Sequence, residues 1–435
     1  MSPVKDHPLR YDLANELHAR PFPSMGANGR VAFLALKREA NAASRDKTED
    51  RNALLALLDR MGSPHPAAGA THYFGPLGRY TLKWEQHTEF VTYTIFCDQI
   101  SERAFDQSEF DVFPSDWLSS LSDKRITSAL IRVEKAPTES QISDNLANWF
   151  VPESLAVSRV LDDGAIVASD FTVDETGHQK FAIFVAPETG ERRLGRIVQR
   201  LCEIETYKAM SMLGFFRCKQ MGIELAEIDA QLFQVMEAMS NTSQKPEDTL
   251  HLLLKLSTEL EHLLAVSAFR FGATKAYKAI VDERIMVLRE QRFQGRQTFY
   301  EFMMRRYEPA MRTVMSTETR LQAMADRAMR AGDLLRTQVD VERSAQNQAL
   351  LESMDKRSDM QLRLQETVEG LSVVAISYYA VSLVSYLFYP LAETLSVSKG
   401  MITAVLTLPV VVAVWMMVRQ IRKKMGHPPT SNDGS

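Results

Sequence analysis

The chain has 435 residues, of which 45% are hydrophobic and 24% are charged, and its formal net charge is -4 at pH 7. Its length leaves room for two or three domains of ordinary globular composition. The slight acidic excess argues against a nucleic-acid partner, because neutralising phosphates requires a basic excess. The three cysteines, Cys97, Cys202 and Cys218, form no CxxC pair and are typical of a reduced compartment.

Residues 1–190 mix strand and helix patterns and are predicted to form an α+β domain with helices packed on one sheet. Aromatic and β-branched residues mark the strands, and leucine spacing in Thr48–Met61 indicates a helix. The predicted strands are Arg30–Lys37, Tyr80–Trp84, Glu89–Cys97, Ser128–Val133, Leu155–Leu161, Gly164–Val173 and Lys180–Val185. Asp and Gly in the turns 162–164 and 174–177 tolerate positive φ, so we expect the last three strands to form a meander.

Residues 191–370 contain helical patterns without a convincing strand and are expected to form a helical domain. The predicted helices are Glu191–Leu213, Glu224–Met239, Asp248–Ser267, Thr274–Phe293 and Thr298–Met311. A final stalk helix, Thr317–Glu369, contains no proline, and unbroken it would be about 75 Å long. Its apolar residues recur at heptad-like spacing at Leu321, Ala325, Ala328, Leu335 and Val339.

Residues 371–418 are predicted to be a transmembrane hairpin. The stretches Leu371–Tyr389 and Met401–Val418 contain no charged residue, and about 20 apolar residues are needed to cross a bilayer. Pro390 follows the first stretch, where we expect its helix to end. Pro409 lies inside the second, where a membrane helix tolerates it with a kink. The alternative is a buried core hairpin of a soluble protein.

Basic residues around the two apolar stretches predict the orientation. Seven basic residues flank the hairpin, and one, Lys399, lies between its spans. The seven are Lys356, Arg357, Arg363, Arg419, Arg422, Lys423 and Lys424. This bias places both termini in the cytoplasm and makes residues 419–435 a basic cytoplasmic tail. The polar N-terminus has no apolar signal core. We therefore expect a two-span protein of the inner membrane whose partners include membrane lipid.

A divalent metal is the one cofactor that the residues suggest. Glu85, His87 and Glu89 alternate and would share one face of a strand, where carboxylate, imidazole and carboxylate groups could bind it. The competing interpretation is a solvated sheet face, and we expect the protein to have no cofactor. His18 and Arg20 are a candidate anion or ligand site. Alternatively, they attach the N-terminal segment to the body.

Two polar sets are candidates for an axis or an oligomer contact. Arg343, Asn347 and Gln348 interrupt the apolar spacing of the stalk helix; they are either a solvated face or a polar layer between copies of the helix. Ser372, Ser377 and Ser382 lie in the first apolar stretch. Small and hydroxyl residues pack helices together in lipid, and the alternative is that they line a path.

Sequence motifs of several enzyme classes are absent. There is no GxxxxGK[ST] phosphate loop, no GxGxxG after a strand, no HExxH and no GxSxG. We therefore predict a protein without enzymatic activity. A membrane-tethered, metal-dependent enzyme that uses Glu85, His87 and Glu89 stays open as an alternative.

Four segments have a distinctive sequence: Asn15–Phe22 (NELHARPF), Lys83–Phe90 (KWEQHTEF), Gln346–Leu351 (QNQALL) and Leu362–Ser372 (LRLQETVEGLS). They resemble a bacterial family of membrane-anchored proteins designated domain of unknown function 3422. The resemblance extends over nearly the whole chain. It implies membrane anchoring and assigns no activity, so it transfers no catalytic residue.

The predicted architecture also resembles that of the CorA-type magnesium channels. Those carry a Gly-Met-Asn motif after the first span, whereas here Gly400-Met401 is followed by Ile402. This resemblance implies a homo-oligomer built around the stalk helix more than it implies magnesium transport. The sequence therefore predicts a cytoplasm-facing membrane scaffold or sensor, and the alternative is an ion channel or transporter of altered selectivity.

Overall fold

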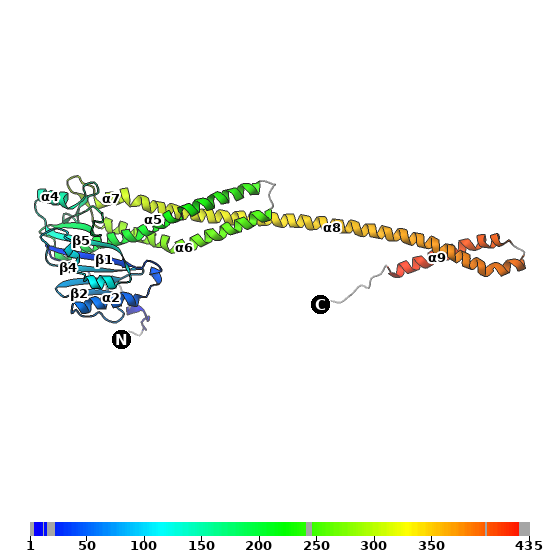
Figure 1. Cartoon of the computed structure of the whole chain (residues 1–435), viewed down its shortest axis with the longest axis horizontal. Coiled ribbons are helices and arrows are strands. Elements are labelled where there is room, and N and C mark those ends of the chain that lie inside the picture. Colours follow the sequence, from blue (N-terminus) through cyan, green and yellow to red (C-terminus); the bar gives the residue numbers. More distant parts are fainter. Residues whose placement is uncertain (1–3, 12, 15–21, 241–245, 396–397, 426–435) are drawn as a thin grey trace. The chain divides into compact units, whose positions relative to one another are not determined.

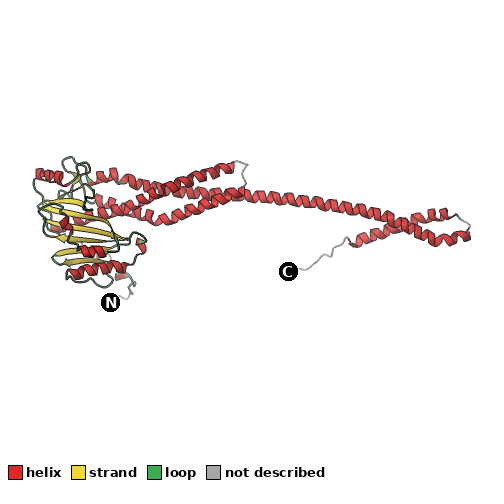
Figure 2. Ribbon diagram, in the orientation of Figure 1, coloured by secondary structure: helices red, strands yellow, loops and turns green. Residues whose placement is uncertain are grey.

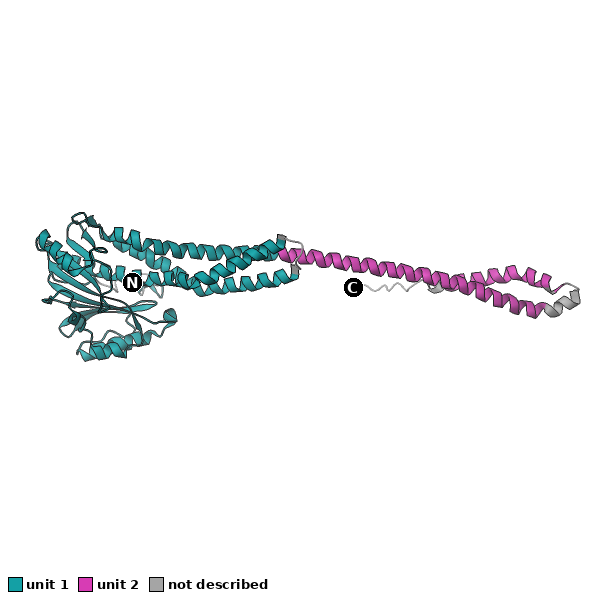
Figure 3. Ribbon diagram, turned by 45° about the horizontal axis from the view of Figure 1, so that its top comes forward, with its two compact units in different colours: residues 1–333 teal, residues 334–435 magenta. Residues whose placement is uncertain are grey.

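The computed structural model describes residues 4–11, 13–14, 22–240, 246–395 and 398–425. The chain divides into two compact units, residues 1–333 and residues 334–435, which are coloured separately in Figure 3. Within the described residues, every strand belongs to the first unit.

The first unit contains one mixed sheet with the strand order β2-β3-β4-β1-β5-β8-β7-β6-β9 (Figure 2). The strands are β1 (Gly29–Lys37), β2 (His72–Leu77), β3 (Tyr80–Gln86), β4 (Phe90–Cys97), β5 (Lys124–Lys135), β6 (Ala156–Val160), β7 (Ala165–Ser169), β8 (Gln179–Val185) and β9 (Gln291–Arg292). Strands β5 and β8 pair in parallel and the other neighbours pair antiparallel. The predicted α+β class of the N-terminal region is confirmed.

The helices account for most of the remaining described chain (Figure 1). They are α2 (Lys47–Arg60), α3 (Ser115–Ser120), α4 (Glu139–Trp149), α5 (Glu191–Ser240), α6 (Pro246–Met286), α7 (Phe299–Arg306), α8 (Glu308–Leu395) and α9 (Lys399–Met425), with the 3-10 turns η1 (Ala42–Ser44) and η2 (Gln107–Phe110). Side chains fix several helix starts: Asp46 accepts from Thr48 N at 2.8 Å, and capping boxes begin α4 and α7.

Each predicted strand overlaps an observed one, and β6, β7 and β8 form the expected antiparallel meander. Leu161, Asp162 and Asp163 of its first turn have φ values of 52°, 55° and 62°. The prediction missed β2, which contains Gly75 and Pro76 and lies at the sheet edge, where proline is tolerated. The expectation that no strand follows residue 190 is wrong, because β9 pairs with β6.

The main hydrophobic core lies between one sheet face and the short helices α2, α3 and α4. Leu54, Leu57, Trp117 and Leu146 from these helices are fully buried there. Alternate residues of β3, such as Leu82 and Trp84, point into this core because successive strand side chains point to opposite faces. The other sheet face is covered by α5, which contacts β5.

Helices α5, α6 and the first part of α8 pack against one another in the first unit. Ion pairs join α8 to its neighbours, as between Lys275 and Glu318 at 2.5 Å and between Arg320 and Asp229 at 2.7 Å. At Gly214 of α5, a Cβ atom would lie 2.3 Å from Thr274 Oγ1 of α6. The predicted breaks inside α5 and α6 are wrong, since each pair of predicted helices is one continuous helix.

The second unit consists of the remainder of α8 and the apolar helix α9. Both helices are long and apolar enough to cross a membrane, over the segments that end at Phe388 and Ile421. The predicted end of the first apolar helix at Pro390 is wrong, because α8 continues to Leu395. A proline removes a single main-chain hydrogen bond from a helix, so a helix can continue through it. Pro409 lies inside α9, as expected.

Candidate functional site

A cavity of about 220 Å³ lies in the first unit between the sheet and helix α5. We call it the sheet–helix cavity. Strands β1, β3 and β4 and helices α5 and α6 supply its walls. Its lining residues are Pro23, Phe33, Lys83, Glu85, His87, Phe90, Thr92, Thr94, Phe96, Gln199, Cys202, Glu203, Thr206, Tyr207 and Arg284. This set is unusual for the interior of a domain because it gathers charges of both signs with several hydroxyl groups.

Strand alternation places Lys83 and Glu85 in this cavity. Their neighbours Leu82 and Trp84 point into the core on the other sheet face, so the two charged side chains point toward α5. Thr94 and Thr92 of β4 are paired with Lys83 and Glu85 in register and line the same cavity. The sheet therefore presents a polar patch at a place where the helix leaves room for a small molecule.

Lys83 is the least satisfied charged group of the cavity. Its side chain is only 5% exposed, and its Nζ lies 3.1 Å from a carboxylate oxygen of Glu85 without making a hydrogen bond. On the opposite wall, Gln199 donates to Glu203 at 2.7 Å, while its own Oε1 is buried and accepts no hydrogen bond from the described residues. Buried polar atoms without partners are rare and mark places where a ligand or bound water belongs.

The helical wall contributes a second ion pair and a thiol. Arg284 of α6 donates to the carboxylate of Glu203 on α5. Burial raises the pKa of the Cys202 thiol far above its ordinary value. Because the thiolate is the nucleophilic form, Cys202 is inert at neutral pH. The cavity therefore offers charge and hydrogen bonding and lacks an activated cysteine nucleophile.

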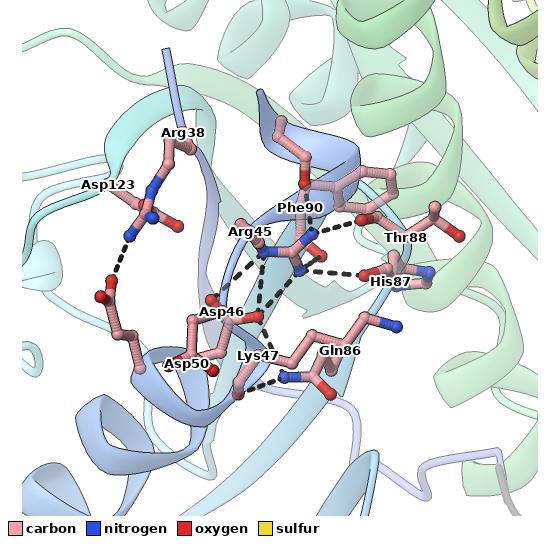
Figure 4. A network of polar contacts seen from close by, with 12 residues as sticks. Arg38, Arg45, Asp46, Lys47, Asp50, Gln86, His87, Thr88, Phe90 and Asp123 are labelled. Atoms are coloured by element: carbon pink, nitrogen blue, oxygen red, sulfur yellow. Dashed lines mark hydrogen bonds and ion pairs between the residues drawn. The ribbon is translucent and has the colours of Figure 1, made fainter. Parts of the chain in front are cut away.

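A buried arginine holds the turn that carries His87 (Figure 4). The guanidinium of Arg45 donates to the main-chain oxygens of His87 at 2.9 Å and Phe90 at 3.1 Å, and also to that of Thr88. Asp50 of α2 balances its charge, with Nη2 and Oδ2 2.8 Å apart. His87 N also donates to Phe90 O at 2.9 Å. The turn is thus fixed by contacts to its main chain, which leaves the imidazole of His87 stacked on Phe90 at the cavity wall.

The expectation that Glu85, His87 and Glu89 share a strand face is wrong. Strand β3 ends at Gln86, and residues 87–89 form the turn into β4. Glu85 and His87 reach the sheet–helix cavity, whereas Glu89 does not line it. Among the residues that the structure describes, no group of three or more His, Cys, Asp or Glu side chains is placed to hold a metal ion.

Glu89 instead joins the sheet to helix α6. Its carboxylate, 1% exposed, pairs with Arg270 and accepts a hydrogen bond from the Tyr277 hydroxyl at 2.8 Å. Burial, followed by the hydrogen bond to Glu89 and its negative charge, raises the pKa of Tyr277. Glu89 is therefore a packing carboxylate whose role depends on α6, about 180 residues later in the chain.

The other candidate residues are dispersed. His18 and Arg20 lie outside the described residues. Arg343, Asn347, Gln348 and Leu371 are exposed on α8, and Met401 is exposed on α9. Tyr389 belongs to α8 and Val418 to α9. The hydroxyls of Ser372 and Ser382 donate to main-chain oxygens four residues earlier, at 2.8 and 3.0 Å, and Ser377 is buried. The structure does not gather these residues into one site.

Sequence reasoning missed Lys83, Gln199, Glu203 and Arg284. The signal for Lys83 was partial, because its alternation with Leu82 and Trp84 predicts the strand face on which it lies but not that a helix covers that face. Gln199, Glu203 and Arg284 had no such signal. They lie on polar helix positions that only the packing of α5 and α6 against the sheet brings to the cavity.

Comparisons with known proteins were made for the whole chain. No curated protein and no solved structure matches it, so the resemblance to CorA-type channels stays a prediction. The family model described as protein of unknown function (DUF3422) matches residues 5–425. This match covers nearly the whole chain, and the protein therefore belongs to the DUF3422 family of unknown function.

Proposed function

We propose that this protein is a membrane-anchored, self-associating scaffold or sensor whose first unit faces the cytoplasm. The observation that carries this proposal is the uncovered apolar surface of α8 and α9. Only 11% and 6% of the most apolar segments of these helices are buried, and Leu387 and Leu408 are 76% and 75% exposed. Apolar surface costs about 25 cal/mol per Å² in water, whereas lipid removes that cost. A core hairpin of a soluble protein would bury the same side chains.

Self-association is supported by a stripe of exposed apolar residues on α8. Leu350, Met354, Leu364, Val368 and Leu371 are 55–66% exposed. They belong to a series of positions spaced by three and four residues. Two positions of this series, between Met354 and Leu364, hold the polar residues Arg357 and Gln361. A stripe of this spacing matches the seam of a coiled coil. We propose that a second copy of this chain covers it, with both copies held parallel by the shared membrane.

Sensing is supported by the sheet–helix cavity. The Lys83–Glu85 pair of the sheet and the Arg284–Glu203 pair of the helices line the same small space, and the buried Nζ of Lys83 lacks a hydrogen bond. A small polar molecule with both an amine and a carboxylate would complement this arrangement. We expect one or more of the standard amino acids to raise the melting temperature of the purified full-length protein, and Lys83→Met to abolish that rise. Lys180→Met, at a partly exposed site outside the cavity, is the matched control.

Single-cysteine labelling tests the anchor and its orientation. Ser398→Cys lies between the two apolar helices, and Ser353→Cys lies on α8 before the first of them. In intact cells, a membrane-impermeant maleimide should label residue 398, while residue 353 should react only after lysis. The native thiols are buried and should stay silent. Release of the protein by alkaline carbonate, or labelling of residue 353 in intact cells, would contradict the proposal.

Cross-linking tests the second copy. Met354→Cys lies on the apolar stripe, whereas Asp359→Cys is five residues further along and points away from it. We expect disulfide-linked dimers of Met354→Cys in nanodiscs and few of Asp359→Cys, together with a discrete oligomer by native mass spectrometry. A monomer with equal, weak cross-linking at both positions would leave the hairpin as an anchor alone.

Neither alternative function gains specific support. Ser372 and Ser382 use their hydroxyls within their own helix, so they do not favour an aqueous path for ions. For a metal-dependent enzyme, Glu85 already lies beside the ammonium of Lys83, and Glu89 is bound to α6. The scaffold or sensor therefore remains the function that the described contacts support best.

A further inference from the structure

A second pocket of the first unit, about 510 Å³ in volume, is lined by four arginines and three apolar residues. We call it the arginine pocket. Its lining residues are Leu161, Arg193, Arg196, Arg200, Met286, Val287 and Arg289. The arginine pocket shares no lining residue with the sheet–helix cavity, and all of its lining residues lie outside the apolar helices.

Three of these arginines lie on one face of α5. Arg193, Arg196 and Arg200 are spaced by three and four residues, so their side chains are neighbours on the helix surface. Like charges at these spacings repel one another and weaken the helix. A simple solvated helix face would gain from alternating signs. Three adjacent cations instead indicate that a negative group belongs in front of them.

The fourth arginine reaches the pocket through two unusual turns. Arg289 follows α6 and has a φ of 50°, in the left-handed region that few residues other than glycine adopt. The turn between β6 and β7 lies against it, because Leu161 N donates to Leu288 O at 2.9 Å. Asp162 of that turn pairs with Arg289 at 2.7 Å. The contact therefore holds the fourth guanidinium beside the other three at the expense of backbone strain.

The charges of the pocket are unbalanced. Asp162 is the carboxylate that pairs with its arginines, at 2.7 Å from Arg289 and 3.8 Å from Arg193. Within the described part of the chain, Arg196 forms no ion pair, and Arg200 donates to the main-chain oxygen of Val287 at 3.2 Å. Burial, and then the charges of Arg196 and Arg284, lower the pKa of Arg200. Among the residues that the structure describes, Asp162 is thus the one carboxylate that forms an ion pair with any of the four guanidinium groups of the pocket.

We propose that the arginine pocket binds a small molecule carrying two or more linked phosphate groups. Guanidinium groups bind phosphate oxygens in pairs, and several in one pocket select a multiply charged anion over a single carboxylate. The apolar side chains of Leu161, Met286 and Val287 provide a surface for the uncharged part of such a molecule. A phospholipid headgroup presents the same phosphate chemistry with a single phosphate.

Calorimetric titration of the full-length protein in detergent with inorganic tripolyphosphate, without added metal, tests this site. We expect Arg196→Gln/Arg289→Gln to weaken binding by about tenfold or more, because two charged hydrogen-bonding groups are removed. Arg292→Gln/Arg312→Gln is the matched control, with the same change in net charge at two exposed arginines outside the pocket. Asp162→Asn removes the competing carboxylate and should tighten binding.

Equal affinity in the pocket and control variants would overturn the proposal, as would undetectable binding to the unaltered protein. If the double variant fails to fold, Asp162→Asn still decides the test. Weakened or unchanged tripolyphosphate binding by Asp162→Asn would contradict the proposal that Asp162 competes with the ligand for the arginines. Competition by dihexanoyl phosphatidylglycerol identifies the source of the phosphate. If the lipid does not compete with tripolyphosphate, the ligand is a free polyphosphate compound. If the lipid binds through the arginines and tripolyphosphate does not bind, the pocket is a lipid site and the proposal is wrong.

Discussion

Charged residues buried in the first unit meet partners from other elements, while apolar residues at the C-terminal end of the second unit meet few. Arg45 lies against Asp50, and Glu89 against Arg270 and Tyr277. In α8 and α9, by contrast, large apolar side chains such as Leu387 and Leu408 are exposed. Burying a charge is tolerated only with a partner, and exposing apolar surface is favourable only in contact with lipid or another protein. The first unit therefore supplies partners for these buried charges from its own elements, whereas the apolar helices of the second unit need lipid or another protein around them.

The largest expected loss of stability comes from removing a charge inside the first unit. Arg45→Met leaves the buried Asp50 without its cationic partner and frees the main-chain oxygens of the 87–90 turn. We expect the free energy of unfolding to fall by about 3–5 kcal/mol. Urea titration followed by tryptophan fluorescence measures it, because three of the four tryptophans belong to the first unit.

Arg38→Met is the control for that variant. Arg38 is partly exposed and pairs with the exposed carboxylate of Glu49 and with Asp123; solvent screens such a group far more than it screens Arg45, and exposed pairs contribute about 0–1 kcal/mol. A similar loss in both variants would show that the position of the Arg45 side chain in the interior is not what matters.

A close contact between α5 and the chain before β1 predicts the next effect. A Cβ atom on Gly195 would lie 1.8 Å from the main-chain oxygen of Pro23. Gly195→Ala should therefore destabilise the first unit by about 3 kcal/mol, since a main-chain atom cannot move aside cheaply. Gly222→Ala on the same helix meets nothing within 4 Å and should stabilise by up to about 1 kcal/mol. Equal melting temperatures for the two variants would refute this packing.

A buried histidine predicts how the stability of the first unit depends on pH. Burial, and then the charge of Arg125, lower the pKa of His178 to about 4. Between that value and its ordinary pKa near 6.5, the unfolded chain binds the proton more strongly, so the folded state loses stability as the pH falls. This contribution is fully present above about pH 6.5, and we expect a loss of about 2 kcal/mol between pH 7 and pH 4.5.

His178→Gln separates this group from the carboxylates that also titrate in that range. The amide can still hydrogen-bond with Ser128, whose Oγ lies 2.9 Å from Nδ1 of His178, and it does not take up a proton. Urea titrations at pH 7 and pH 4.5 should therefore show a smaller pH dependence in the variant. An unchanged slope would assign the pH dependence to other groups.

The smallest effect on folding is expected in the second unit. Leu364→Gln changes an exposed residue of the apolar stripe and should alter the free energy of unfolding of the first unit by less than about 0.5 kcal/mol. The same substitution should reduce the oligomer mass in nanodiscs if a second copy covers the stripe. A loss of stability in the first unit without a change in the oligomer mass would contradict both expectations for this variant.

Several features of the fold could be predicted because they depend on neighbours in the chain. The aromatic and β-branched residues of Tyr80–Trp84 are a local pattern, and they predicted strand β3, which the structure extends to Gln86. The aspartates of the 162–164 turn and the uncharged stretches of α8 and α9 are equally local. Where local signals were weak, the prediction failed, as at the edge strand β2 and at the helix continuing through Pro390.

The sequence by itself determined the strand and helix periodicities, the apolar hairpin and the family resemblance, since each of these is carried by residues close together in the chain. The tertiary structure decided which charges meet. It turned Glu89 toward α6, placed Gln199 and Arg284 opposite Lys83, and brought Arg289 to the arginines of α5. These contacts join residues about 90 to 200 positions apart, and only the packing of helices on the sheet fixes such distances.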